Sequence, residues 1–336
     1  MHAVILAGGK GTRLRPLTDT RPKPLLPFMG EPFAVGLLRR LAEVGCDRAT
    51  FLVGADATPW RGLEADGVDV TVVTEETPLD TAGAARRLLG AGADGPVLVC
   101  NGDILTDLDF AELLAAHEQA DAAATLALTR VGDTTSFGVV VCDDDGVVRD
   151  FVEKPAPGTV DADTVNAGTY VLAPDVFAGF PGDGPLSFER AVFPGLLDAG
   201  ARLLGVVSDA HWQDLGTPER YLAGHRAVLE GRCAWPLGAG LRLQGATGVH
   251  SSAQVDPTAD VGPGVVVGPD CTVGPGARLA DAVLHAGVAV GAEVQVRGAI
   301  VGPGARIGAT AVVGPDVVLA DGQVVAAGTR IPAGAA

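Results

Sequence analysis

One repeat governs what the last third of this 336-residue chain can fold into. From about residue 250, glycine follows an aliphatic residue at positions 262, 268, 274, 291, 302, 308 and 314, where we expect it to form turns. Such a six-residue repeat is typical of a parallel β-helix with three hexads per coil. A flexible glycine-rich tail would not keep the register, and the repeat predicts between four and five coils. The aliphatic positions, six residues apart with two five-residue steps, are Val255, Val261, Val267, Val273, Leu279, Leu284, Val290, Val296, Val301, Ile307, Val313, Leu319, Val325 and Ile331.

The first 230 residues follow a different pattern, in which short apolar runs alternate with helical spacing. Runs such as HAVILAG, RATFLVG and GPVLVCNGD predict strands, and 33–45, 59–65 and 81–91 predict helices. Valine-rich strands joined by helices favour a mostly parallel sheet with helices on both faces. After Asp121 the strands become hairpin-like, with 137–153 turning at Asp-Asp-Asp-Gly. We predict an α/β domain over 1–232, a linker over 233–250 and the repeat domain over 251–336.

Composition excludes several classes of function. The formal net charge of −17 argues against nucleic acid as a partner, because phosphate-backbone binding needs a basic face. The only apolar run at the N-terminus, residues 3–7, is too short for a signal peptide, and no stretch approaches the ~20 apolar residues of a membrane span. The five cysteines are widely spaced and lack a Cys-x-x-Cys pair. We therefore expect free thiols in a cytoplasmic protein without a zinc site.

A basic, glycine-rich segment follows the first predicted strand. Residues 1–25 hold Lys10, Arg13, Arg15, Arg21 and Lys23 against one acidic residue, and the whole chain has only three lysines beside 21 arginines. Glycines let a backbone approach a phosphate closely, so this segment predicts an anion site. It is not a Walker P-loop, since lysine stands between the glycines. It also fails the dinucleotide fingerprint, because leucine replaces the third glycine and proline interrupts any following helix.

The segment GGKGTRLRPLTDTRPKP resembles the signature of the sugar-1-phosphate nucleotidyltransferases, the nucleotide-sugar pyrophosphorylases. The motifs NGDIL (101–105), FGVVV (137–141), FVEKP (151–155), NAGTYVL (166–172) and WQDLGTP (212–218) occur in that family's order. With the hexapeptide repeats the resemblance covers essentially the whole chain, and among subfamilies it is most similar to the mannose-1-phosphate guanylyltransferases. It implies a Rossmann-like nucleotidyltransferase domain followed by a left-handed parallel β-helix.

The resemblance implies roles for individual residues. Arg13 and Lys23 match the catalytic positions, Arg13 holding the β- and γ-phosphates with help from Lys10, and Lys23 standing near the α-phosphate. Lysine acts as a compact charge and arginine as a planar fork, and all three lysines fall in family motifs. The positions that match nucleotide binding are Leu6, Ala7, Gly8, Gly9, Gly11, Thr12, Arg13, Asp80, Thr81, Gly83, Asn101 and Gly102. Those that match sugar-phosphate binding are Gly138, Glu153, Lys154, Asn166 and Gly168.

Two carboxylates predict a metal site. Asp103 and Asp214 each follow a predicted strand, and few carboxylates plus phosphate oxygens suit Mg²⁺. Each has a simpler interpretation, Asp103 as part of a turn and Asp214 as a residue ahead of a helix with Thr217 as N-cap and Pro218 at its first position. Taken as a pair in family order, they favour the metal.

Several alternatives stay open at this point. Adjacent strand residues face opposite ways, so Glu153 and Lys154 can both face a ligand only where the strand ends. Asp80 stands where guanylyltransferases usually have glycine, which leaves GTP, ATP or a pyrimidine triphosphate as substrate, with a hexose-, heptose- or cyclitol-1-phosphate. A bifunctional enzyme would use His250 or His285 for acyl transfer on the β-helix, and a dead scaffold homologue would have lost the motif residues. The weakly charged β-helix predicts a homo-oligomer.

Overall fold

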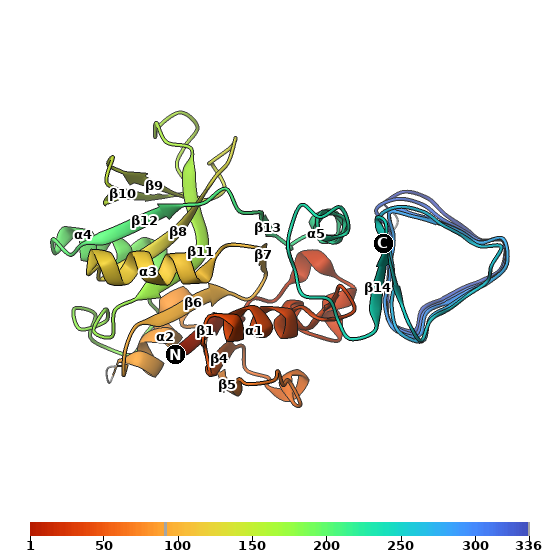
Figure 1. The fold of residues 1–336 in the computed structure, drawn as a ribbon, viewed down its shortest axis with the longest axis horizontal. Helices are drawn as coiled ribbons and strands as arrows, with labels where there is room; N and C mark the ends of the chain where they lie inside the picture. The colour runs from red at the N-terminus through yellow and green to blue at the C-terminus, as the bar shows by residue number, and fades with distance from the viewer. Residues whose placement is uncertain (91–92, 335–336) are drawn as a thin grey trace. The chain divides into compact units, whose positions relative to one another are not determined.

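The computed structural model describes residues 1–90 and 93–334, and its contacts divide the chain into two compact units (Figure 1). The sheet unit comprises Met1–Gly9 and Leu38–Trp212. The repeat unit comprises Lys10–Leu37 and Gln213–Ala336. The basic segment at 10–25 therefore groups with the C-terminal part of the chain, although it directly follows the first strand.

The sheet unit contains a nine-stranded sheet with the order β10-β9-β11-β6-β1-β4-β5, in which β8 pairs with β11 and β12. Strands β6, β1, β4 and β5 run parallel, as the valine-rich runs predict. Strand β11 runs antiparallel to β6, β8 and β9, and β9 and β10 form the predicted hairpin. The strands are β1 (His2–Leu6), β4 (Arg48–Val53), β5 (Asp69–Thr74), β6 (Val97–Asn101), β8 (Ala124–Arg130), β9 (Gly138–Cys142), β10 (Val148–Glu153), β11 (Thr164–Leu172) and β12 (Leu203–Val207).

The helices follow local signals in the sequence. Helix α1 ends just before Gly45, whose φ of +80° suits glycine, and Asp109 caps α3 by accepting two backbone N–H groups. The helix expected over 59–65 is wrong, because only a 3₁₀ turn forms at Thr58–Trp60 and Gly62 leaves the helical region with φ +78°. The helices are α1 (Phe33–Glu43), α2 (Asp80–Leu89), α3 (Phe110–Ala120), α4 (Phe193–Asp198) and α5 (Pro218–Leu229).

The repeat unit winds most of its residues into a triangular parallel β-helix (Figure 1). Pairing joins residues 18 apart, as in Val255 with Val273, or 17 apart, as in Val267 with Leu284. The 17-residue coils are those that contain a five-residue step. Strands β14 and β15 pair antiparallel, and β15 pairs with β18, so the segment predicted as a linker supplies the start of one sheet. The strands are β14 (Leu241–Gln244), β15 (Thr247–His250), β16 (Gln254–Val255), β17 (Asp260–Val261), β18 (Val265–Val267), β19 (Thr272–Val273), β20 (Arg278–Ala280), β21 (Val283–Leu284), β22 (Ala289–Val290), β23 (Gln295–Arg297), β24 (Ile300–Val301), β25 (Arg306–Ile307), β26 (Val312–Val313), β27 (Val318–Leu319), β28 (Val324–Val325) and β29 (Arg330–Ile331).

All fourteen repeat aliphatics pack into the interior of the coil, which confirms the predicted register. The turn role expected of the following glycines is wrong. A Cβ at Gly268 would lie 2.8 Å from the backbone oxygen of Leu284, and one at Gly274 would lie 2.9 Å from the carbonyl carbon of Gly291. These glycines allow the next coil to stack closely. The left-handed turn residues come two positions later, at Gly264 and Gly276.

An aromatic cluster fixes the chain between α5 and the β-helix. Trp235 stacks on Phe33 at 4.6 Å between ring centroids and meets Phe28 edge-on at 5.8 Å. Gly36 lies beneath the indole, where an added Cβ would approach Trp235 Nε1 to 2.6 Å. Trp235 therefore attaches the chain after α5 to the aromatic side chains of Phe28 and Phe33.

Two buried histidines in the repeat unit should make the fold acid-sensitive. Burial lowers the pKa of His225 to about 4 and that of His285 to about 3, from an ordinary 6.5. In the unfolded chain both histidines gain a proton near pH 6.5. In the folded protein the same two side chains stay neutral until the pH falls to about 4 for His225 and about 3 for His285. The unfolded state therefore binds more protons below pH 6.5, and stability falls in that window as pH decreases.

We expect the melting temperature to decrease between pH 7 and pH 5, with up to about 1.4 kcal/mol of unfolding free energy lost per pH unit for each histidine. His285→Gln should reduce this pH dependence, because glutamine does not titrate. His250→Gln is the control for the substitution itself, since His250 lies in the same unit and is only partly buried. A wild-type melting temperature that is flat from pH 7 to pH 5 would contradict the prediction.

Candidate active site

The first cluster of predicted site residues lies at the carboxyl ends of β1 and β6 in the sheet unit. Leu6 pairs with Asn101, and the Gly102 amide donates to the Leu6 carbonyl at 2.9 Å. Beyond them Gly8 and Gly9 are exposed, and a Cβ at Gly9 would meet no atom within 4 Å. Packing within the fold therefore does not require this glycine, and the backbone stays accessible to a ligand. Open α/β sheets bind ligands at this edge.

The bulge of β11 brings two further predicted residues beside Asn101. Gly168 has φ +73°, and its Cβ would lie 2.3 Å from Asn101 Nδ2, so only glycine fits. The Asn166 side chain accepts from the Gly168 amide at 2.9 Å and donates to the Tyr170 hydroxyl at 2.6 Å. The NAG motif is therefore a rigid turn against the end of β6.

The EKP motif lies where β10 ends, as the facing argument requires. Glu153 is the last residue of β10, and Lys154 leaves the strand with φ +49° while its amide donates to the Phe137 carbonyl. The two side chains stay within 3.5 Å of each other. Gly138 pairs with Glu153, and a Cβ there would lie 2.9 Å from the Glu153 carboxylate. Lys154 remains exposed to solvent.

Three of the predicted nucleotide-binding residues, Asp80, Thr81 and Gly83, open helix α2. Asp80 takes φ +60°, a left-handed conformation that suits glycine and that aspartate tolerates better than most residues. Its carboxylate accepts from Arg190 at 2.6 Å. Thr81 accepts from the Phe188 amide, and the Gly83 amide donates to the Leu186 carbonyl. Asp80 thus adopts the left-handed backbone conformation at this position, and its carboxylate is neutralised by an ion pair with Arg190.

Two aromatic residues outside the predicted set support this edge of the sheet unit. The Trp212 indole donates to the Ala167 carbonyl at 2.8 Å, inside the NAG turn. The same ring meets Phe137 edge-on, with centroids 5.4 Å apart. Trp212 therefore connects the NAG turn to the start of β9. The sequence signal that could have identified Trp212 as a site residue is its position in the WQDLGTP motif.

The second cluster lies in the repeat unit around Asp214, at the end of β13 (Trp212–Asp214). Lys23 Nζ donates to Asp214 Oδ1 at 2.8 Å, Arg220 to Oδ2 at 3.0 Å, and Arg13 lies 3.8 Å from Oδ2. Lys23 is 9 % exposed, whereas Arg13 is 65 % exposed. Three cations around one carboxylate leave an excess of positive charge that suits a polyphosphate. Sequence reasoning missed Arg220, on the first turn of α5.

Two glycines let the chain pass close to these cations. A Cβ at Gly216 would lie 2.7 Å from Arg13 Nη2 and 2.8 Å from Asp214 Oδ2, so any larger residue would displace one of them. Gly11 has φ +60°, and the Thr18 hydroxyl donates to its carbonyl at 2.9 Å. The basic segment therefore folds as a series of short 3₁₀ turns at Thr12–Leu14, Leu17–Asp19 and Lys23–Leu25.

The predicted metal ligands belong to different units, Asp103 to the sheet unit and Asp214 to the repeat unit. A carboxylate offers about four lone-pair positions, so the Asp214 contacts leave acceptor capacity for a hard cation. Within residues 1–90 and 93–334, no group of three or more His, Cys, Asp or Glu side chains is arranged to hold a metal ion.

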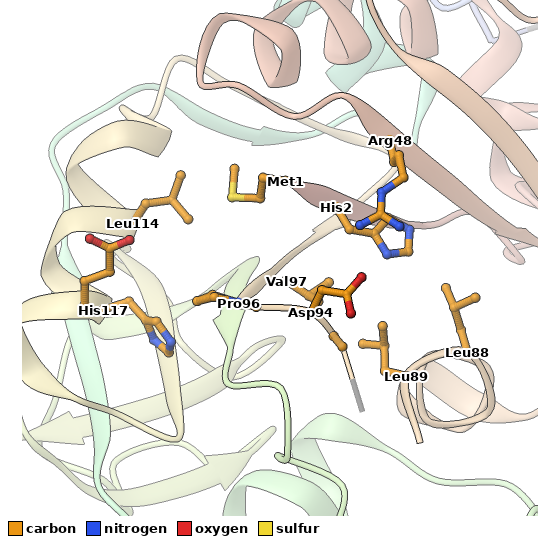
Figure 2. Close-up of a pocket in the computed structure, with 13 residues that line it drawn as sticks. Met1, His2, Arg48, Leu88, Leu89, Asp94, Pro96, Val97, Leu114 and His117 are labelled. Atoms are coloured by element: carbon orange, nitrogen blue, oxygen red, sulfur yellow. The ribbon is translucent and has the colours of Figure 1, made fainter. Parts of the chain in front are cut away.

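A cavity of about 580 Å³ lies at the opposite edge of the sheet (Figure 2). It is lined by His2, Arg48 and Val97 at the amino ends of β1, β4 and β6, and by His117 of α3. None of the predicted site residues lines it. The glycine-rich segment and the NGD motif instead lie at the carboxyl ends of β1 and β6.

Rival chemistries find little support in the geometry. Burial raises the pKa of the Cys46 thiol to about 11 and that of Cys100 to about 12, so these free thiols are poor nucleophiles. His285 is buried with a pKa of about 3, and His250 Nε2 contacts the Ala239 carbonyl at 2.8 Å. Neither histidine is set up as an accessible base for acyl transfer. In the described ranges no helix has the length and apolar character that crossing a membrane requires.

Comparison with known families agrees with both halves of the chain. A family described as nucleotidyl transferase matches residues 2–231, and a second family, the GMPPB C-terminal domain, matches residues 243–332. The chain belongs to the nucleotidyl transferase family and is an enzyme of this class. This confirms the family, the α/β domain and the repeat domain predicted from the motifs.

Individual relatives are similar over most of the chain. A mannose-1-phosphate guanylyltransferase of Mycobacterium tuberculosis is 40 % identical over 266 residues, covering 76 % of this chain and 72 % of the relative. A probable mannose-1-phosphate guanylyltransferase 3 of Oryza sativa is 36 % identical and covers 76 % and 73 %. Among solved structures, HddC from Yersinia pseudotuberculosis complexed with GMP-PN has a TM-score of 0.55 at 28 % identity, covering 66 % of this chain and 97 % of that one.

Proposed function

We propose that this enzyme condenses GTP with mannose 1-phosphate to give a nucleotide sugar and pyrophosphate. The observation that carries the proposal is the 40 % identity to a mannose-1-phosphate guanylyltransferase across most of both chains. The named relatives share this activity, and the similar structure that holds GMP-PN supports a guanine nucleotide. The free cysteines support the cytoplasm as its compartment.

In the proposed reaction a phosphate oxygen of the sugar attacks the α-phosphorus of the triphosphate, and pyrophosphate leaves. Positioning and charge neutralisation do most of the catalysis in such a step. Exposed Arg13 is suited to hold the β- and γ-phosphates through its planar fork. Lys23, held by Asp214, would act on the α-phosphate. Exposed Lys154 and half-buried Glu153 would bind the phosphate and a hydroxyl group of the sugar.

We propose Mg²⁺ as the cofactor, with Asp103 and Asp214 as its protein ligands. A bound Mg²⁺ neutralises developing charge on the phosphates. Two carboxylates are the hard oxygen donors that this ion prefers, and phosphate oxygens complete such sites. Asp214 would have to share its oxygens between the ion and the cations that it now holds. The same carboxylate would then position both Lys23 and the metal.

The proposed substrates are tested with a panel of triphosphates and sugar 1-phosphates while pyrophosphate release is measured. We expect GTP with mannose 1-phosphate to give the highest kcat/KM, by at least about tenfold over ATP, dTTP and UTP, which corresponds to about 1.4 kcal/mol of discrimination. Glucose 1-phosphate and a heptose 1-phosphate are the comparison sugars. A higher kcat/KM for another pair would replace the proposed substrates.

The metal ligands are tested by Asp103→Asn and Asp214→Asn. We expect each to lower kcat about 100-fold or more, since an amide binds Mg²⁺ far less well than a carboxylate, and to raise the Mg²⁺ concentration that gives half-maximal activity. The circular dichroism spectrum should not change. Asp66→Asn is the matched control, because Asp66 is exposed in a loop. Near-normal activity of both variants at low Mg²⁺ would refute the assignment.

We also infer that the protein self-associates through the β-helix. Val324 on β28 is 71 % exposed, which is unusual for a large aliphatic side chain in this fold. Burying such a residue against a second copy removes apolar surface from water. Light scattering of the intact protein should give a dimer or larger assembly, and Val324→Asp should shift it toward the monomer. A wild-type monomer at micromolar concentrations would contradict this inference.

A further inference from the structure

The basic segment is attached to the β-helix by a side-chain contact that spans the chain. Asp321 follows β27, and its Oδ2 accepts from Arg21 Nη2 at 2.6 Å. The same oxygen accepts from the Thr20 hydroxyl at 2.8 Å. Arg21 and Asp321 are 26 % and 23 % exposed, so the ion pair is largely shielded from water. Charge-assisted hydrogen bonds in such surroundings are the strong ones.

Arg21 is connected to Lys23 by a stiff piece of backbone. Pro22 stands between them with φ −58°, and Lys23 then enters a 3₁₀ turn that ends at Leu25. Because proline fixes φ, movement at Arg21 is transmitted to Lys23 rather than absorbed between them. The position of Lys23 therefore depends on whether Arg21 is held.

The other side of Lys23 is held by helix α5. The Tyr221 hydroxyl donates to the Pro27 carbonyl, and His285 Nε2 lies 3.1 Å from the same hydroxyl. His225 Nε2 accepts from the Met29 amide at 3.4 Å. Lys23 thus lies between an anchor at Arg21 and one at Pro27. Asp321 and His285 both belong to the β-helix, which therefore contributes to both anchors.

One feature of Asp321 argues that folding stability alone does not explain it. Within the described part of the chain, its second oxygen, Oδ1, is buried without a hydrogen-bond partner. A buried acceptor without a partner opposes folding, and a buried ion pair is often neutral for stability compared with an apolar replacement. The Asp321 carboxylate therefore contributes little to the free energy of folding. Its hydrogen bonds instead hold Thr20 and Arg21 in place.

We propose that Asp321 is a positioning residue for nucleotidyl transfer, which acts through Arg21 to orient Lys23. The β-helix then has a role in turnover beyond self-association. This inference rests on the proposed function, because it assigns Lys23 to the reacting phosphate.

The test compares Asp321→Ala and Asp321→Asn with wild type in the full-length protein. We expect Asp321→Ala to lower kcat about tenfold or more, since small misplacement of a positioned group is costly, while KM for both substrates changes less than about twofold. The kcat of Asp321→Asn should lie between those of Asp321→Ala and wild type, because the asparagine amide oxygen can still accept a hydrogen bond from Arg21 but carries no charge. The matched control is Asp260→Ala, an exposed acid on β17 of the same β-helix, which should keep wild-type kcat.

A second measurement does not depend on activity. Backbone amides of residues 17–28 should exchange hydrogen faster in Asp321→Ala than in wild type, while the melting temperature stays within about 3 °C. Combining Asp321→Ala with Arg21→Gln should add little further loss of kcat. Unchanged kcat and exchange in Asp321→Ala would overturn the proposal, as would a loss of kcat that Asp260→Ala shares. If wild type transferred no nucleotide to any sugar phosphate, the proposed function would fail, and faster exchange would still establish the anchor itself.

Discussion

The carboxylate of Asp214 organises the cationic part of this protein. It collects Lys23 and Arg13 from a segment near the N-terminus and Arg220 from helix α5. Without a central anion, three cations at these distances would repel one another and separate. With it, they form a preorganised group with an excess of positive charge, in which the lysine is buried against Asp214. Gly216 permits this approach because it has no side chain to intrude.

The repeat unit serves as a rigid support for that segment. Its coils repeat every 17 or 18 residues around an aliphatic interior, and they carry Asp321, which binds Arg21, and His285, which contacts the Tyr221 hydroxyl. Trp235 adds a stacked contact to Phe33 at the end of the same segment. These contacts explain why residues 10–37 form one compact unit with the β-helix. A domain that looks like an appendage in the sequence is thus part of the arrangement that holds Lys23.

Much of the fold could be predicted from particular residues. The fourteen aliphatics of the repeat all pack inside the coil, because only one face of each short strand can point inward. The end of β10 at Glu153 also followed from the requirement that two adjacent residues face one way. The glycines of the repeat were misinterpreted, since close stacking of the next coil and a left-handed turn both select glycine. The two causes differ only in the folded structure, where the first glycine faces the next coil and the second takes a positive φ.

The sequence by itself determined the family, the two kinds of architecture and the set of charged motif residues, because these depend on local periodicity and on residue types at fixed spacing. The tertiary structure decided which charges meet. Lys23 joins Asp214 and Arg190 neutralises Asp80 through contacts between residues 191 and 110 positions apart in the chain. Asp321 reaches Arg21 across 300 residues, a contact that the repeat pattern alone does not predict. Long-range contacts of this kind depend on the summed geometry of every coil and turn between them, and that geometry exists only once the chain has folded.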